Sequence, residues 1–425
     1  MNSRMGRRHF LAASSTLALG AITAPSYAQP KLQGAKSAWW CWRGPNGDGT
    51  CDQTISHSLQ KDKMKWATPV PGRGHASATV TDSAIYLPTA NKAQQTQSVL
   101  AFNRADGKPL WSQVIHRGGL NHKNHPKNTE ATPTIAFDGE RLFAVFFNAD
   151  AIHLTALNPQ GETVYQKTLG SYKPDKYPYG YAPSPIIYQN FVLIAAEYEL
   201  EAYIVALDRA TGNEIWRIKR PNNYSFSPPI VARTSGRDQL VISGANQVAS
   251  YDPMTGQQLW TTAATTAATC GSIVWDEERV YASGGYPKPE TVCIASDGSG
   301  RLIWKNDQKC YEQSMLYHEG AVYCVNDTGI AYCWRASDGE VMWRERFGGP
   351  FSSSPTLAKD VIHVFSEAGE HFAYRPNPER FELLAREQVA TDVFASPSIV
   401  ENTMYLRVGN TGPDGVRQEY LAALT

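Results

Sequence analysis

The residues best suited to binding or chemistry lie in one basic segment that runs from His116 to Thr129. Its three histidines, at spacings of six and three, could bind a metal, or its lysines and asparagines could hold an anionic or sugar ligand. An exposed polar loop without a ligand is the alternative. The candidate ligand-binding residues of this segment are His116, His122, Lys123, His125, Lys127 and Asn128.

A second candidate segment, residues 171–181, is rich in tyrosine and contains Tyr172, Tyr177, Tyr179 and Tyr181. Aromatic loops suit the stacking of carbohydrates or contact with a partner protein, and simple loop packing is the alternative. We take Tyr179 and Tyr181 as the candidate ligand-binding residues here.

Three carboxylates follow predicted strands and could point toward a common centre: Glu197, Asp327 and Glu367. Their convergence on one point would favour a metal or quinone site, and their dispersal into turns would argue against one. Glu197 joins the candidate ligand-binding residues. No nucleophile–base set, phosphate loop or close metal-ligand motif is recognisable, so we name no catalytic residue and no metal site.

Seven cysteines in a chain with an export signal permit disulfides. Cys41 and Cys51 flank a Gly/Pro/Asn/Asp loop, which makes them the best candidate disulfide. Cys324 and Cys333 are expected on successive strands, opposite each other across a turn at Thr328-Gly329. Cys293 and Cys333 occupy a small-residue position, where a buried small hydrophobic residue is the preferred interpretation.

A repeated phrase determines which elements must position these residues. Residues 206–216, 250–260 and 333–343 match in register, and looser copies end at Trp111, Tyr165, Trp304 and Leu384. Each phrase predicts a strand, a turn in which glycine supplies a positive φ, and a strand ending in a tryptophan buried between repeats. The residues assigned a structural role are Trp66, Trp111, Trp216, Trp260, Trp304, Trp343, Gly212, Gly256 and Gly339.

A period of about 40–50 residues built on strands and turns predicts an all-β, eight-bladed β-propeller. Eight second strands are recognisable, around Tyr86, Phe143, Leu193, Val241, Tyr281, Tyr323, His363 and Tyr405. The last repeat stops after its third strand, so we expect an N-terminal strand at residues 64–70 to supply the fourth and close the ring. Seven blades is the alternative if the degenerate unit near residues 375–388 is not a blade.

The Ala-x-Asp-x-x-Thr-Gly-x-x-x-Trp phrase resembles the repeat of the pyrroloquinoline-quinone (PQQ)-like β-propellers, over about residues 60–425. That superfamily includes the quinoprotein alcohol dehydrogenases and the propeller lipoprotein of the outer-membrane assembly machine. The segment 42–49 also looks like the start of exported, uncharacterised members. The dehydrogenases use two vicinal cysteines beside the quinone, which this chain lacks. They also hold calcium with carboxylate and amide ligands that do not map onto it. PQQ with calcium is the cofactor that the enzyme alternative would require.

The first 28 residues resemble a twin-arginine export signal, with Arg7-Arg8, a short apolar run, and a small-x-small cleavage site at Ser26-Tyr27-Ala28. The apolar run is too short to span a bilayer. The cleavage site has no cysteine that would indicate a lipid anchor. We expect three parts: a signal peptide at 1–28, an N-terminal cap at 29–58 and the propeller at 59–425.

Charge and composition narrow the function further. Lys plus Arg equals Asp plus Glu at 40 each, and removal of the signal leaves a net charge of −3. Nothing in this balance indicates a nucleic-acid partner. The sequence favours an exported, monomeric propeller that acts as a binding or scaffold module in the periplasm or outside the cell. The alternatives are a quinone- or metal-dependent oxidoreductase, and a carbohydrate-binding accessory protein. The identity of the ligand or partner stays open.

Overall fold

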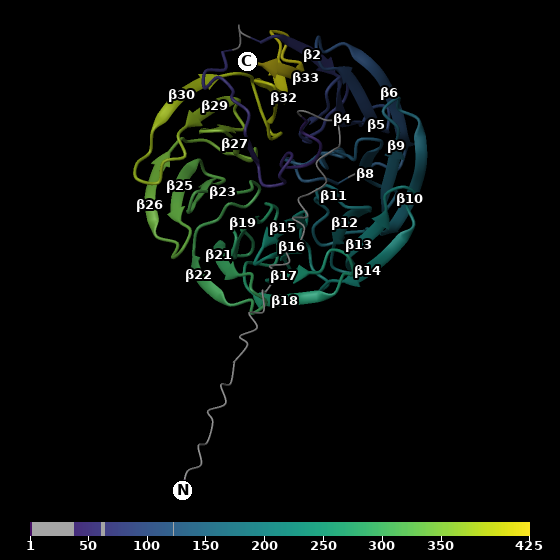
Figure 1. The fold of residues 1–425 in the computed structure, drawn as a ribbon. Coiled ribbons are helices and arrows are strands. Elements are labelled where there is room, and N and C mark those ends of the chain that lie inside the picture. Colours follow the sequence, from purple (N-terminus) through teal and green to yellow (C-terminus); the bar gives the residue numbers. More distant parts are fainter. Residues whose placement is uncertain (2–37, 61–63, 122) are drawn as a thin grey trace.

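The computed structural model describes residue 1 and residues 38–60, 64–121 and 123–425. Within these ranges the regular secondary structure consists of β-strands, and the strands form eight separate sheets. Figure 1 shows these sheets as blades that follow one another around a ring. The protein is therefore an all-β, eight-bladed β-propeller, as the repeats predicted, and the seven-blade alternative is wrong.

The first four blades each contain four antiparallel strands in chain order. Blade 1 is β3 (Thr79–Val80), β4 (Ala84–Asn91), β5 (Thr96–Asn103) and β6 (Pro109–Arg117). Blade 2 is β7 (Ala136–Phe137), β8 (Leu142–Asn148), β9 (Ala151–Leu157) and β10 (Thr163–Ser171). Blade 3 is β11 (Ile186–Tyr188), β12 (Phe191–Glu197), β13 (Ala202–Asp208) and β14 (Glu214–Lys219). Blade 4 is β15 (Ile230–Thr234), β16 (Arg237–Gly244), β17 (Gln247–Tyr251) and β18 (Gln258–Ala263).

The remaining blades follow the same plan, with both ends of the chain entering the last two. Blade 5 is β19 (Val274–Trp275), β20 (Arg279–Gly284), β21 (Glu290–Ala295) and β22 (Leu302–Asn306). Blade 6 is β23 (Leu316–His318), β24 (Ala321–Val325), β25 (Ile330–Arg335) and β26 (Val341–Arg346). Blade 7 is β27 (Thr356–Ala358), β28 (Val361–Phe365), β29 (Glu370–Tyr374) and β30 (Leu383–Gln388), with β1 (Thr50–Cys51) added parallel to β27. Blade 8 is β31 (Ser398–Val400), β32 (Thr403–Thr411), β33 (Arg417–Leu424) and β2 (Trp66–Val70).

Blade 8 joins the two ends of the propeller. The N-terminal strand β2 pairs antiparallel with β33, with Trp66 opposite Ala423 and Val70 opposite Glu419, and Figure 1 shows β2 beside β33 near the C-terminus. This is the pairing that the missing fourth strand of the last repeat predicted. Main-chain hydrogen bonds between the first and last repeats leave no open strand edge at this seam.

The repeated phrase has a clear structural role at each blade contact. Asp208 Oδ1 accepts hydrogen bonds from the backbone N–H groups of Ala210 and Thr211, which fixes the turn. The following glycines have positive φ, +69° at Gly212 and +73° at Gly256. A Cβ on Gly256 would lie 2.9 Å from the ring of Trp216 in the preceding blade. Glycine is therefore needed both for the turn and for close packing on the neighbouring tryptophan.

Serine and threonine residues just before the inner strands form hydrogen bonds from blade to blade. The backbone N–H of Ser354 donates to Ser396 Oγ at 2.8 Å, and that of Ser314 donates to Ser354 Oγ at 2.9 Å. The same bond joins Ser272 to Ser314, Ser77 to Thr134 and Thr134 to Ser184. Because the partners are buried, these bonds fix the inner ends of the blades around the axis.

The N-terminal segment from residue 38 to 60 is held against the inner strands without a disulfide. Buried Arg43 donates to the carbonyl oxygens of Pro355 and Met315, each at 2.7 Å. Cys41 and Cys51 are both free thiols, so the predicted Cys41–Cys51 disulfide is wrong. The two side chains pack into separate hydrophobic clusters, and the Cys41 thiol donates to the carbonyl oxygen of Gly44 instead.

The prediction that Cys324 and Cys333 lie opposite each other is also wrong, because the pairing of β24 with β25 is shifted by one residue. Tyr323 lies opposite Cys333, and Cys324 lies opposite Tyr332. Since side chains alternate along a strand, this shift puts the two thiols on opposite faces of blade 6.

Candidate functional site

A cavity of about 370 Å³ is present among the described residues. Its wall takes side chains from all eight connections that run from the outer strand of one blade to the inner strand of the next, so it lies on the propeller axis. The volume is in the range of small-molecule sites. Its aromatic lining consists of Trp42, His75, His125, Tyr177, Tyr179, Tyr224, Phe226, Tyr286, Tyr311 and Phe394.

Tyr177 is the centre of a tyrosine cluster in this wall. Its ring centroid lies 4.2 Å from that of Tyr224, 5.6 Å from that of Tyr179 and 5.7 Å from that of Tyr286. The hydroxyls of Tyr177 and Tyr286 are 2.9 Å apart. Tyr179 and Tyr286 keep 39% and 43% of their surface exposed. Several ring surfaces are thus available to a ligand at the mouth of the cavity.

An ionic network also borders the cavity. The Lys127 ammonium lies 2.6 Å from Glu367 Oε1 and 3.8 Å from Glu312 Oε2. Ser352 Oγ contacts both carboxylates at 2.7 Å. Burial opposes the charge of Lys127, but the hydrogen bond to Glu367 and the two carboxylates outweigh it and raise the Lys127 pKa. The connection before blade 2 is therefore tied to the connections of blades 6 and 7.

Burial raises the pKa of Glu312, and the neighbouring charges of Asp327 and Glu367 add to this effect. The hydrogen bond from Ser352 and the Lys127 ammonium oppose it. Both of these partners contact Oε2, and Oε1 has no hydrogen-bond partner among the described residues. Glu312 therefore offers one unpaired acceptor to the cavity that it lines.

The inner end of the cavity is formed by Trp42 of the N-terminal segment together with hydroxyls of the inner-strand phrases. Trp42 Nε1 donates to Ser272 Oγ at 2.8 Å, and Ser184 and Ser396 also line the cavity. His75 stacks on Phe394 with ring centroids 4.6 Å apart. The N-terminal segment thus contributes directly to the cavity.

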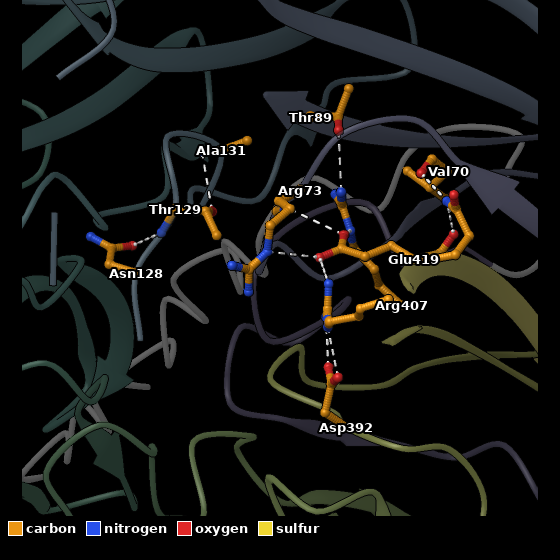
Figure 2. Close-up of polar contacts among 12 residues, drawn as sticks. Val70, Arg73, Thr89, Asn128, Thr129, Ala131, Asp392, Arg407 and Glu419 are labelled. Atoms are coloured by element: carbon orange, nitrogen blue, oxygen red, sulfur yellow. Dashed lines mark hydrogen bonds and ion pairs between the residues drawn. The ribbon is translucent and has the colours of Figure 1, made fainter. Parts of the chain in front are cut away.

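Beside His75, an ionic cluster joins blades 8 and 1, and Figure 2 shows Glu419 between arginines from different segments. Arg407 Nε donates to Glu419 Oε2 at 2.5 Å, Arg417 lies 3.0 Å from Oε1, and Arg73 lies 3.6 Å from it. Burial disfavours the Glu419 charge, but Arg407 and Arg417 outweigh burial and lower the Glu419 pKa. Burial, with a smaller contribution from these arginines, lowers the pKa of His75 to about 3, so this imidazole is neutral.

The structure brings four of the predicted ligand-binding residues together: His125, Lys127, Asn128 and Tyr179 all line the axial cavity. Asn128 Nδ2 donates to the carbonyl oxygen of Tyr179 at 2.6 Å, and the His125 ring packs edge-on against the Tyr179 ring. The two candidate segments of the sequence therefore form one wall. Whether these residues bind a ligand stays a prediction.

The other candidates of these segments lie elsewhere. His116 is in β6, with its ring 4.8 Å from that of His153 on the blade 2 sheet, and not in a loop. Tyr181 is buried and donates its hydroxyl to the carbonyl oxygen of Ala195. Lys123 is exposed and away from the lining, and His122 lies outside the described residues.

Glu197 does not face the cavity. It is buried at the end of β12 and accepts from Arg220 Nε at 2.6 Å, and Arg220 Nη1 in turn donates to the Tyr251 hydroxyl. Asp327 pairs with Lys309 at 2.8 Å. The three carboxylates singled out by sequence are therefore each matched by a cation. Across the described ranges, no group of three or more His, Cys, Asp or Glu is placed to hold a metal.

Sequence reasoning missed Tyr224, Tyr286, Tyr311 and Glu312, which line the cavity. Three of the four lie shortly before an inner strand, in the connection that returns from the rim to the axis. The position within the repeat was therefore a usable signal, because every such connection must pass the central opening.

A known protein family matches most of this chain. The family described as outer membrane protein assembly factor BamB matches residues 52–199, 200–310 and 288–376. The chain belongs to this family of PQQ-like propellers. Among curated relatives, the BamB of Legionella pneumophila is 23% identical over 163 residues, covering 33% of this chain and 42% of that protein. The BamB of Shewanella oneidensis is 26% identical over 92 residues, covering 18% and 23%. The matches thus span less than half of each relative's length.

Solved structures share the fold over most of the chain. BamB from Moraxella catarrhalis aligns with a TM-score of 0.59 and 14% identity, over 84% of this chain and 96% of that one. A europium-containing methanol dehydrogenase aligns with a TM-score of 0.65 and 11% identity, over 93% and 99%. The quinohemoprotein alcohol dehydrogenase of Comamonas testosteroni gives 0.62 and 12%, over 91% and 80%. At these identities the likeness concerns the fold alone.

The dehydrogenase fold raises the question of whether the cavity fits PQQ with calcium. PQQ carries three carboxylates, whereas Lys127 is the only described residue of the cavity lining with an ammonium or guanidinium group, and it is already paired with Glu367. Within the described ranges no metal-binding group of three ligands is present, and the sequence has no two adjacent cysteines. The described residues therefore do not fit this cofactor, and we derive no reaction step through it.

Proposed function

We propose that this protein is an exported β-propeller that acts as a binding module, with the axial cavity as its ligand site. The observation that carries the proposal is the cavity itself, which all eight inter-blade connections line. Its wall combines aromatic rings with a few convergent polar groups, which is typical of small-molecule sites. The scaffold residues of the repeats are occupied in turns and blade contacts, so the connections are the parts free to bind.

Export is supported by the sequence of the first 28 residues, with Arg7-Arg8 and a small-x-small cleavage site. The part of the chain that the structure describes contains no helix long and apolar enough to cross a membrane. We propose a twin-arginine route to the periplasm, which replacement of Arg7-Arg8 by Lys-Lys tests. The expected result is retention of the unprocessed chain inside the cell, and unchanged export would contradict the proposed route.

The ligand site is tested by filling the cavity. Ala182 lines it, and Ala182→Trp introduces a large ring there, whereas Ala210→Trp puts the same ring on an exposed outer turn. We expect any small molecule that raises the melting temperature of the wild-type protein to bind Ala182→Trp about tenfold more weakly or worse. Ala210→Trp should bind normally. Equal binding by both variants would place the ligand elsewhere and refute the proposed site.

A role in outer membrane protein assembly is the second candidate, favoured by the family match from residue 52 to 376. Such a role would be carried by a surface for a partner protein. Chemical cross-linking of the exported protein in cells tests it, with identification of the linked partners. Linkage to outer membrane assembly components, unchanged in Ala182→Trp, would favour this role over a small-molecule site.

A further inference from the structure

The charges around the cavity mouth balance. Lys127 pairs with Glu367 and also approaches Glu312, and Lys309 pairs with Asp327. The Lys176 ammonium lies 5.7 Å from the centroid of the Tyr177 ring. Among the described residues that line the cavity itself, one ammonium group, Lys127, thus stands against one carboxylate, Glu312, and the neutral imidazole of His75 adds no charge. The arginines beside His75 are bonded to Glu419 and Asp392, and none of them lines the cavity.

This balance argues against charged ligands. A polyanion would need unpaired cations, and Lys127 could serve one only by leaving Glu367. An organic cation would be drawn to the tyrosine faces, but Lys176 already lies over Tyr177 and Tyr224, within 5.9 Å of both centroids. Its positive charge would repel a second cation at the same rings.

A purely apolar ligand fits no better. Glu312 lines the cavity and its Oε1 has no hydrogen-bond partner among the described residues, so an apolar group that covered this oxygen would remove its hydration without replacing the hydrogen bond. Asn128, Thr132 and Ser352 add further polar groups to the same wall. The ligand must therefore supply hydrogen-bond donors as well as an apolar surface.

We propose that the axial cavity binds an uncharged, polyhydroxylated ring compound, that is, a neutral saccharide. This inference rests on the proposed function and specifies its ligand class. The C–H face of a sugar ring can cover an exposed aromatic ring such as Tyr179, and its hydroxyls can donate to Glu312 and bond to neighbouring polar groups. No part of such a ligand requires an unpaired charge from the protein.

The test is isothermal titration of the exported, processed protein with maltose, cellobiose, lactose and N,N′-diacetylchitobiose. Glucosamine and glucuronate serve as cationic and anionic probes of the same ring size, with glucose as their neutral counterpart. We expect at least one neutral disaccharide to bind, and glucose to bind about tenfold more tightly than either charged probe. Stronger binding of glucosamine or glucuronate, or binding of none of the disaccharides, would overturn the saccharide inference.

Variants connect this binding to the cavity. Tyr179→Leu removes an aromatic face and Glu312→Gln removes the carboxylate, and each should weaken disaccharide binding about tenfold. Tyr420→Leu, on β33 and outside the cavity lining, is the matched control and should bind normally. Unaltered binding by Tyr179→Leu and Glu312→Gln, with both folded by circular dichroism, would also overturn the inference.

Failure of the saccharide inference would not by itself refute the proposed function. If another small molecule binds and Ala182→Trp blocks it, the cavity is a ligand site and only the saccharide class is wrong. If every ligand found binds Ala182→Trp as well as wild type, the proposed function itself fails.

Discussion

Replacing Arg220 tests whether Glu197 belongs to the scaffold or to a ligand site. The two side chains form an ion pair at 2.6 Å, with 0% and 2% of their surfaces exposed. Arg220→Met would leave the Glu197 carboxylate buried without its partner, and would also remove the hydrogen bond to the Tyr251 hydroxyl. Breaking one side of a buried pair costs about 3–5 kcal/mol, because the remaining charge is uncompensated.

The expected fall in melting temperature follows from the size of the propeller. With an unfolding entropy of about 2.1 cal/mol/K per residue, a propeller of roughly 370 residues has an entropy near 0.8 kcal/mol/K. A loss of about 3–5 kcal/mol thus corresponds to roughly 4–6 °C in a calorimetric scan. Arg217→Met is the matched control, because the Arg217–Glu214 pair is partly exposed and should contribute at most about 1 kcal/mol.

The double variant Arg220→Met, Glu197→Leu separates the charge from the packing. Replacing a buried ion pair by apolar residues of similar volume is often neutral, so the double variant should regain most of the lost melting temperature. Ligand binding should be unchanged in it, since neither residue lines the cavity. A single Arg220→Met variant as stable as Arg217→Met, or a double variant that folds but no longer binds, would refute the structural assignment of Glu197.

Two further predictions concern the blade contacts and the buried histidines. Gly256→Ala should destabilise more than Gly236→Ala: both glycines have positive φ near 75°, but only a Cβ at Gly256 meets the Trp216 ring, whereas nothing lies within 4 Å at Gly236. Equal urea midpoints for the two variants would contradict this packing argument. Burial lowers the pKa of His363 to about 3 and holds that of His371 well below its usual value. Below about pH 6.5 the unfolded chain therefore binds protons that the folded chain does not. Stability should be full above pH 6.5 and fall as the pH drops toward 3, at up to about 1.4 kcal/mol per pH unit for each histidine. The urea midpoint should fall less between pH 7 and pH 5 in His371→Gln than in the wild-type protein. An unchanged pH dependence of the midpoint would show that His363 and His371 do not cause the loss of stability.

The fold could be predicted from the sequence because its determinants recur. The glycine and the tryptophan of the phrase recur at the same positions in several repeats. The glycine fixes a turn and packs on the tryptophan of the preceding blade, as Gly256 does on Trp216. Counting strands also predicted that an N-terminal strand at residues 64–70 would complete the last blade, and β2 (Trp66–Val70) does so. The recurring residues meet the same local geometry in every repeat. A single sequence therefore provides several independent observations of each structural position.

The site was only partly predictable, because its residues do not recur. His125, Lys127 and Tyr179 were found since they belong to long or unusual segments, whereas Tyr311 and Glu312 sit in a short connection without a distinctive pattern. Glu197 shows the converse error. It ends the second strand of blade 3, but its direction depends on Arg220, which directly follows β14, a contact that spacing alone does not reveal. The Cys41–Cys51 disulfide failed for the same reason, because the loop between them is fixed by Arg43 instead.

The contrast between repeat and connection explains why fold and ligand can vary independently in such a propeller. The inner-strand hydroxyls and the blade-contact tryptophans are committed to the scaffold whatever occupies the axis. The charge near the cavity is set by ion pairs between loops of different blades, such as Lys127 in the connection before blade 2 with Glu367 in the β28–β29 turn. A few substitutions at those pairs would change the ligand class and leave the ring intact. Function in this chain must therefore be argued from how each charge at the axis is paired, and that pairing favours a neutral ligand over an anionic quinone.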